Sequence, residues 1–102
     1  MAPSHPGSII QNWILPEDMT ITESAKLLGV SRQSLDALVN ERRSVTPEMA
    51  LKLEAVFGGT ARLLLALQKR YDLYRAEQNI AEITKGLKPY KTHPSHAQTQ
   101  AA

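Results

Sequence analysis

The chain of 102 residues contains no cysteine, few aromatic residues and no long apolar run. Without cysteine it forms neither disulfides nor thiolate metal sites, and this composition suits the cytoplasmic location that we expect. Its apolar stretches fall far short of the roughly 20 residues of a membrane-spanning helix. The first ten residues lack the charged and apolar regions of a secretion signal. We therefore expect no contact with a membrane.

Catalytic motifs are also missing. Ser31 lacks the Gly-x-Ser-x-Gly elbow of a hydrolase, and no glycine-rich loop is present that would cradle a phosphate. His93 and His96 form an H-x-x-H pair without a third ligand, and His5 stands at the other end of the chain. The sequence predicts neither an enzyme nor a metal or other cofactor.

Charge is distributed unevenly along the chain. Residues 1–57 contain five Lys and Arg against seven Asp and Glu, whereas residues 58–102 contain seven against three. A surface that binds nucleic acid would therefore depend on a few placed basic residues and on doubling by dimerisation. Ordinary solvation of a protein surface explains the same charges equally well.

What is present favours helices throughout. Alternating β-branched runs and hairpin dipeptides are missing, and the length fits one domain. Favourable N-cap residues precede three of the predicted helices, at Thr20, Ser31 and Thr46. Glycine follows two of them, at Gly29 and Gly58. The pattern predicts an all-α fold of five helices.

Apolar residues at helical spacing mark the expected core. In the first segment these are Ile9, Ile10, Trp13 and Ile14, and Pro16 ends that segment. We assign Trp13 to the core, with no role in stacking on bases. The next three helices are expected to bury Ala25, Leu27, Leu28, Leu35, Leu38, Val39, Met49, Ala50, Leu53, Val56 and Phe57.

The last segment runs from Thr60 to Gly86 without a strong breaker and is predicted to form one longer helix. Its second half carries an apolar seam with the 3-4-3-4 spacing of a heptad pattern. Little chain remains to cover this seam, so we predict that it pairs two subunits or docks a protein partner. The residues of this C-terminal stripe are Leu73, Ala76, Ile80, Ile83 and Leu87. Residues 1–87 are expected to form the domain, and residues 88–102 a disordered tail.

Residues 25–38 have the spacing of a helix-turn-helix. The small Ala25 allows a second helix to pack closely, and Gly29 permits the positive φ of the turn. Val30, Leu35 and Leu38 then fill the space between the two helices. The second helix, polar near its start, is expected to lie against a partner outside the protein.

These features resemble the XRE family of helix-turn-helix repressors and, more closely, its HigA-type antitoxin branch. The matching segments are "HPGSII", "LGVSRQSLDALVNERRSVTPEMALKLEAVFG" and "LLLALQKRYDL". The chain departs from the family at Ile21, where a glutamine usually touches a phosphate, and at Glu41, which replaces a glycine. Leu64 or Leu65 stands where a tryptophan is common. The resemblance implies a lambda-repressor-like fold.

The resemblance also implies roles for the second helix and the loop after it. Arg32 and Gln33 would read guanine and adenine in the major groove, and Ala37 would meet a thymine methyl. Phosphate contacts are implied for Ser31, Ser34, Asn40, Arg42 and Arg43.

Each of these roles has a simpler alternative. Arg32 and Gln33 would also fit a solvated first turn of a helix. Asn40 would fit a C-cap, and Arg42 and Arg43 would fit an ordinary surface loop. Asp36 would repel phosphates, so we expect it to face away from DNA or to pair with Arg32 in its absence.

The resulting hypothesis is a sequence-specific DNA-binding antitoxin that acts as a homodimer. The resemblance implies that it represses its own operon and neutralises a RelE-like mRNA-cleaving toxin. Two alternatives stay open: a stand-alone repressor without a toxin, and a helical protein-interaction module that has lost DNA binding.

Overall fold

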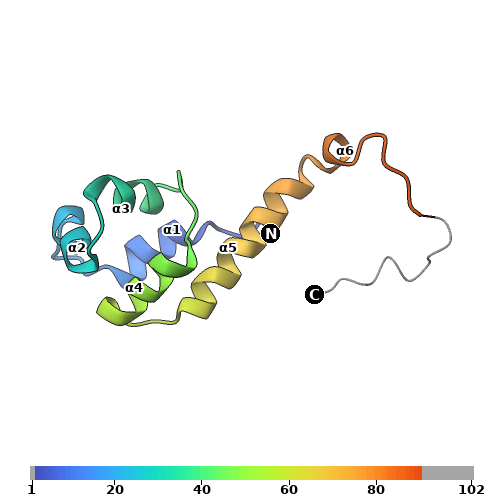
Figure 1. The fold of residues 1–102 in the computed structure, drawn as a ribbon. Coiled ribbons are helices and arrows are strands. Elements are labelled where there is room, and N and C mark those ends of the chain that lie inside the picture. Colours follow the sequence, from blue (N-terminus) through green and yellow to red (C-terminus); the bar gives the residue numbers. More distant parts are fainter. Residues whose placement is uncertain (1, 91–102) are drawn as a thin grey trace.

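The computed structural model describes residues 2–90, which fold into α-helices joined by short turns (Figure 1). The elements are α1 (Pro6–Ile9), a π-helical segment η1 (Ile10–Ile14), α2 (Ile21–Leu28), α3 (Arg32–Val39), α4 (Pro47–Phe57), α5 (Ala61–Glu77) and α6 (Ile80–Ile83). The predicted all-α fold is confirmed. Six α-helices are present in the described range instead of five, because the segment from Thr60 to Gly86 divides into α5 and α6.

Side chains cap the helices where the sequence predicts them. The Thr20 hydroxyl accepts from the Glu23 backbone N–H at 3.0 Å, and the Thr20 N–H donates to the Glu23 carboxylate at 2.8 Å. Ser31 and Thr46 likewise accept from backbone N–H groups in the first turns of α3 and α4. Each cap satisfies a donor that has no partner inside its helix, which stabilises the helix by about 1 kcal/mol.

The core lies where α1 to α4 meet the first half of α5. Its buried apolar residues are Ile10, Leu15, Ala25, Leu28, Leu35, Leu38, Val39, Val45, Ala50, Leu53, Ala61 and Leu64. Gly7 brings α1 against α3, because a Cβ at this position would collide with the backbone oxygen of Leu38. The N-terminal segment therefore packs closely against the backbone of α3 near Leu38.

Trp13 does not belong to this core, and its assignment was wrong. Its side chain is 82% exposed, whereas Ile10 is fully buried and Ile14 is half-buried. The cause is the π-helical turn, in which the Leu15 N–H donates to the Ile10 carbonyl at 2.9 Å. This wider turn changes the angle between successive side chains. Residues whose spacing would put them on one face of an α-helix therefore do not share a face here.

Two other residues expected in the core are exposed. Leu27 is 54% exposed and Val56 is 42% exposed. Each lies on a helix whose buried face is taken by neighbours, Ala25 and Leu28 in α2 and Leu53 in α4. One side of each short helix meets the core, and residues just off that side face outward.

The C-terminal stripe does not lie on one continuous helix. The long helix ends at Glu77, and α6 begins only after Gln78 and Asn79. The second half of α5 and all of α6 project away from the rest of the fold, which gives the chain extents of 57 × 25 × 23 Å (Figure 1). Residues 87–90 follow as exposed chain without helix, and residues 91–102 of the predicted tail lie outside the described range.

Candidate nucleic-acid interface

The turn between α2 and α3 has the predicted glycine geometry. Gly29 has φ +71° and ψ +31°, in the left-handed region. Its N–H donates to the Lys26 carbonyl at 3.2 Å, and the Val30 N–H donates to the Ala25 carbonyl at 3.0 Å. This pair of bonds is a Schellman motif, which satisfies the last carbonyls of α2 and fixes the direction in which the chain leaves the helix.

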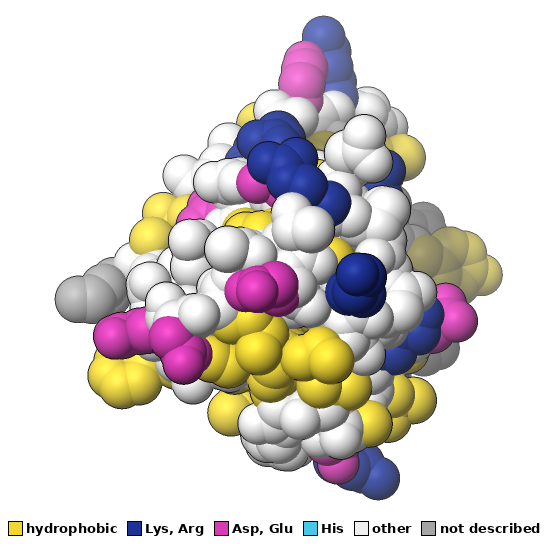
Figure 2. Space-filling view, turned by 90° about the vertical axis from the view of Figure 1, so that its left-hand side faces the viewer, with side chains coloured by type: hydrophobic (Ala, Val, Ile, Leu, Met, Phe, Trp, Pro, Cys, Tyr) yellow, Lys and Arg dark blue, Asp and Glu magenta, His cyan; other side chains and the backbone are white. Residues whose placement is uncertain are grey.

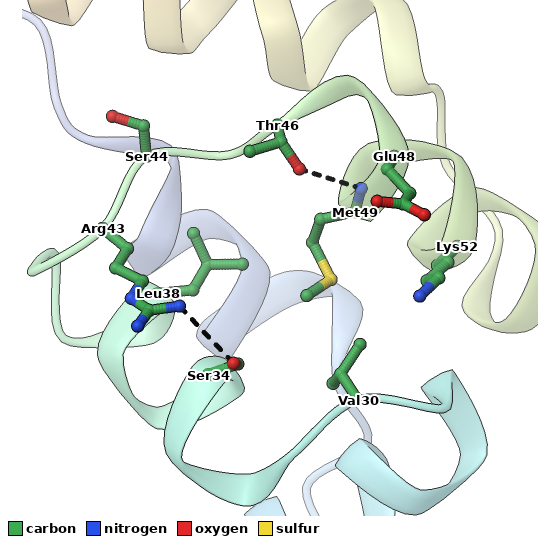
Figure 3. A pocket seen from close by; sticks show the side chains of 9 residues that line it. All are labelled: Val30, Ser34, Leu38, Arg43, Ser44, Thr46, Glu48, Met49 and Lys52. Atoms are coloured by element: carbon green, nitrogen blue, oxygen red, sulfur yellow. Dashed lines mark hydrogen bonds between the residues drawn. The ribbon is translucent and has the colours of Figure 1, made fainter.

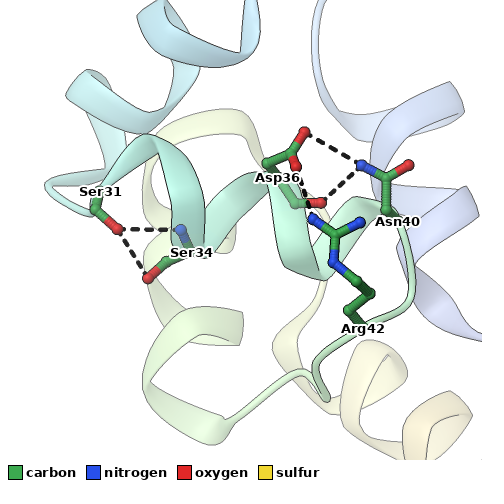
Figure 4. A network of polar contacts seen from close by, with 5 residues as sticks. All are labelled: Ser31, Ser34, Asp36, Asn40 and Arg42. Carbon is green, nitrogen blue, oxygen red and sulfur yellow. Dashed lines mark hydrogen bonds and ion pairs between the residues drawn. The ribbon is translucent and has the colours of Figure 1, made fainter.

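The start of α3 presents polar side chains on a fixed backbone. The Ser31 hydroxyl accepts from the Ser34 N–H at 3.0 Å and donates to the Ser34 hydroxyl at 2.9 Å (Figure 4). Arg32 and Gln33 follow in the first turn, and both are exposed. Ala37 lies further along the helix and is half-buried. The structure thus places the predicted base-reading residues on one rigid element.

At the other end of α3, Asp36 pairs with Arg42. The pairing with Arg32 that the sequence offered was wrong. An Arg42 guanidinium nitrogen lies 2.9 Å from an Asp36 carboxylate oxygen. Asn40 occupies the C-cap, and its amide donates to the Asp36 backbone and side-chain oxygens at 2.9 and 3.2 Å (Figure 4). Arg32 therefore keeps its guanidinium away from this carboxylate, while Arg42 is held beside the helix end.

The loop from α3 to α4 contains a backbone conformation that is unusual for its residue. Glu41 has φ +64°, where a glycine stands in the resembling family. A residue with a Cβ costs about 1–2 kcal/mol in the left-handed region. The Arg42 N–H donates to the Ala37 carbonyl at 2.7 Å, which holds this turn against the helix. Glu41 lines one hollow together with the two loop arginines, Arg42 and Arg43.

A hollow of about 250 Å³ lies between α3, this loop and α4 (Figure 3). Arg43 reaches across it toward α3, with a long contact of 3.5 Å to the Ser34 hydroxyl. Lys52 lines the same hollow from α4 and was not singled out from the sequence, because a single lysine in an amphipathic helix carries no signal of its own. Glu48 also lines the hollow, so positive and negative charges meet there.

Buried polar residues hold the loop to the rest of the protein. Gln68 in α5 is 4% exposed; its carbonyl oxygen accepts from the Val45 N–H at 2.8 Å, and its amide donates to Asp72 at 2.9 Å. His5 is 3% exposed, accepts from the Gly7 N–H at 2.8 Å and packs edge-on against Tyr71 at 4.9 Å. These residues belong to the segments that carry the family resemblance. Their contacts show that they have a structural role, which is to hold the loop and the N-terminal segment against α5.

The C-terminal stripe is open to solvent. Leu73 is 59% exposed, Ile80 and Ile83 are each 56% exposed, and Leu87 is 72% exposed. Ala76 is exposed on the same half of α5. The break between α5 and α6 means that these five residues are not brought together as a straight seam.

Within residues 2–90, no helix is long and apolar enough to cross a bilayer. In the same range, no group of three or more His, Cys, Asp or Glu is arranged to hold a metal ion. His93 and His96 lie outside the described residues.

Known proteins resemble both the sequence and the fold. Residues 10–64 match the helix-turn-helix family. The uncharacterized HTH-type transcriptional regulator YbaQ of Escherichia coli strain K12 is 42% identical over 79 residues, which cover 76% of this chain and 70% of YbaQ.

Solved structures of antitoxins superpose on most of the chain. The antitoxin GraA has a TM-score of 0.77 at 31% identity, covering 87% of this chain and 98% of GraA. GraA in complex with its operator has a TM-score of 0.74 at 32% identity, covering 87% of this chain and 92% of GraA. Pseudomonas aeruginosa antitoxin HigA with the higBA promoter has a TM-score of 0.73 at 29% identity, covering 86% and 98%. The matched segment includes α2, the glycine turn and α3, so the chain belongs to the XRE-type helix-turn-helix family, with HigA- and GraA-type antitoxins as its structural neighbours.

Proposed function

We propose that this protein binds a specific DNA operator through α3. The observation that carries the proposal is the first turn of α3, where Arg32 and Gln33 are exposed on a helix capped by Ser31. An arginine offers two donors to guanine, and a glutamine offers a donor and an acceptor to adenine. Ala37 would meet a thymine methyl on the same face. GraA in complex with its operator and HigA with the higBA promoter are similar to this chain in fold, which supports operator binding.

Phosphate contacts would fix the register of α3 without reading the sequence. We assign them to Ser31, Ser34, Asn40, Arg42 and Arg43. Arg42 forms an ion pair with the Asp36 carboxylate, and the Asn40 amide donates to the same group. The ion pair offsets the negative charge of Asp36, which would otherwise repel a phosphate. The hollow that contains Arg43 also contains Lys52, which adds a basic group that the sequence did not reveal.

One copy of α3 reads only a few base pairs, so we propose a homodimer on two half-sites. A two-fold dimer requires a self-complementary apolar surface. The C-terminal stripe supplies apolar side chains that this subunit does not bury. We assign the stripe to subunit pairing or to docking of a toxin.

The partner is proposed to be a RelE-like mRNA-cleaving toxin, and the operator to lie in front of the protein's own operon. GraA and HigA are antitoxins, which supports this assignment. An exposed tryptophan is a frequent anchor of protein–protein contacts, and Trp13 is 82% exposed. On the face drawn in Figure 2, the largest hydrophobic area lies in the lower half, apart from the main group of basic side chains in the upper half.

A stand-alone repressor is the second candidate. The name of YbaQ, an HTH-type transcriptional regulator, favours it. Both candidates share the DNA-binding step and differ only in the toxin.

The experiment that tests the shared step is a gel shift on the promoter of the protein's own gene, at several salt concentrations. Binding that prefers this promoter over a random duplex of equal length is expected. Equal binding to both duplexes would contradict sequence-specific recognition, and no binding to either would favour an interaction module. Co-expression with the product of a neighbouring toxin-like gene then separates antitoxin from stand-alone repressor, because only an antitoxin restores growth.

A further inference from the structure

A second hollow, of about 130 Å³, lies between the α3–α4 loop and α5. Arg42 and Arg43 line it from the loop, and Arg75 lines it from α5. Three guanidinium groups from two separate elements thus border one small opening. Arg75 stands eleven positions beyond the end of the helix-turn-helix match at residue 64, so the matched family segment does not include it.

The wall contributed by α5 is held in place by buried contacts. Tyr71 packs edge-on against His5, which is 3% exposed, at a centroid distance of 4.9 Å. The Arg75 guanidinium donates to the Tyr71 hydroxyl at 2.8 Å and lies 5.7 Å from the centre of the ring. Arg75 is therefore oriented by a side chain that is itself fixed on the core, and loses less freedom when it binds a ligand.

Of the three guanidinium groups at the hollow, Arg42 is already paired with Asp36 at 2.9 Å, so Arg43 and Arg75 are the two without a carboxylate partner among the described residues. Two carboxylates also border it, those of Glu41 and Asp72. Asp72 already accepts from the Gln68 amide at 2.9 Å, which occupies part of its acceptor capacity. Guanidinium groups match the oxygens of a phosphate because they present several donors in one plane.

We propose that this hollow seats a phosphate of the DNA backbone, so that α5 extends the DNA-binding surface through Arg75. The inference rests on the proposed function, because Arg42 and Arg43 follow α3 directly and are assigned to phosphates when α3 lies in the major groove. A DNA strand whose phosphates contact Arg42 and Arg43 would come within reach of Arg75, which lines the same hollow. Arg75 contributes affinity and orientation but reads no base.

The test is the salt dependence of DNA binding for Arg75→Gln. Each phosphate contact adds about 0.9 to the slope of log affinity against log salt. The variant should lose about one from this slope on both the promoter and a random duplex. Its deficit relative to the wild type should therefore shrink about fourfold between about 50 and about 200 mM salt.

Two matched variants separate a phosphate contact from a general effect. Arg70→Gln removes the same charge from α5 beside Leu73 and Tyr74, in a different hollow, and should leave the slope unchanged. Arg75→Lys keeps the charge and should restore most of the slope. Thermal unfolding and sedimentation should show that each variant keeps the fold and subunit number of the wild type.

An unchanged slope for Arg75→Gln, or an equal loss for Arg70→Gln, would overturn the inference while leaving the proposed function intact. If the wild type binds no duplex, the proposed function fails and the inference fails with it. Titration with inorganic phosphate, followed by the NMR signal of the Arg75 side chain, addresses a free-anion site. Saturable binding of phosphate that survives in the presence of bound DNA would also overturn the assignment to the DNA backbone.

Discussion

The α2–α3 region and the C-terminal projection differ in what determines their structure. In the first, each helix end is fixed by local chemistry: the Thr20 capping box, the left-handed Gly29 and the Ser31 cap. In the second, residues 73–87 have an apolar spacing that predicts one straight helix, yet the chain breaks at Gln78 and Asn79. Caps act on neighbouring backbone groups and need no partner, whereas an apolar seam remains helical mainly through packing against another element. Among residues 2–90, the main packing partner of α6 is α5 itself, so little packing against a separate element supports the projection.

The largest effect is expected from charging the projection. Replacing Ile80 and Ile83 together by Lys should give a folded monomer, because both side chains are exposed and contribute nothing to the core of one subunit. Loss of the second half-site contact should weaken operator binding about 100-fold or more. Sedimentation measures the mass, and a gel shift measures the affinity.

The matched control is Ala81→Lys with Thr84→Lys, which adds the same charge at exposed positions next in sequence to Ile80 and Ile83. It should keep the dimer mass. An unchanged dimer in the Ile80 and Ile83 variant, with toxin binding also intact, would show that the projection mediates neither contact.

The next effect concerns strain in the turn. Gly29→Val should lower the free energy of unfolding by at least about 1–2 kcal/mol, because a residue with a Cβ resists positive φ. No heavy atom lies within 4 Å of the added Cβ, so the cost comes from the backbone and not from a clash. Urea unfolding and DNA binding should decline together.

Gly86→Val sharpens the comparison. Gly86 has φ +80° and also has open space around its Cβ, but it lies in the projection. The same strain there should leave global unfolding unchanged, since no packed core depends on the turn. Equal destabilisation by the two variants would mean that the projection is as cooperative a part of the fold as α2 and α3.

A smaller effect is expected at Glu41, the non-glycine residue at φ +64°. Glu41→Gly should raise the free energy of unfolding by up to about 1 kcal/mol, because strain is relieved. It should also strengthen DNA binding, because a carboxylate is removed from the side of the loop arginines. Glu41→Gln keeps the strain and removes the charge, so it should improve binding without improving stability. If Gly and Gln variants have equal stability, the left-handed conformation is not strained.

The smallest effect on stability is expected at Trp13. Trp13→Ala should change the free energy of unfolding by less than about 0.5 kcal/mol, as at other exposed positions. Leu53→Ala, at a fully buried position in α4, should cost about 2–5 kcal/mol. If Trp13→Ala lowers the free energy of unfolding as much as Leu53→Ala, the tryptophan is part of the core in solution. Loss of toxin neutralisation without loss of stability would support a protein contact at Trp13.

These contrasts also show how far the sequence determines the result. The starts of α2, α3 and α4, the glycine ends of α2 and α4, and the turn at Gly29 were predicted, because each depends on two or three adjacent residues. The end of α5 at Glu77 was missed, because no glycine or proline marks it. The exposure of Trp13 was not predicted, since it follows from a π-helical turn that has no marker in residue type. The Asp36–Arg42 pair was missed as well, because the reversal of the chain at Glu41 brings Arg42 back beside α3. Family resemblance supplied the roles of Arg32 and Gln33, because a base contact depends on the DNA as well as on the protein.

The central claim is that α3 reads bases through its first turn. The most direct test compares Arg32→Ala with Arg43→Ala on the promoter and on a random duplex, across a series of salt concentrations. Arg32→Ala should cost about 1–3 kcal/mol on the promoter, much less on random DNA, and relax the preference at one base pair. Arg43→Ala should weaken both duplexes alike and lower the salt slope by about one. Equal losses for Arg32→Ala on promoter and random DNA would contradict base reading by α3.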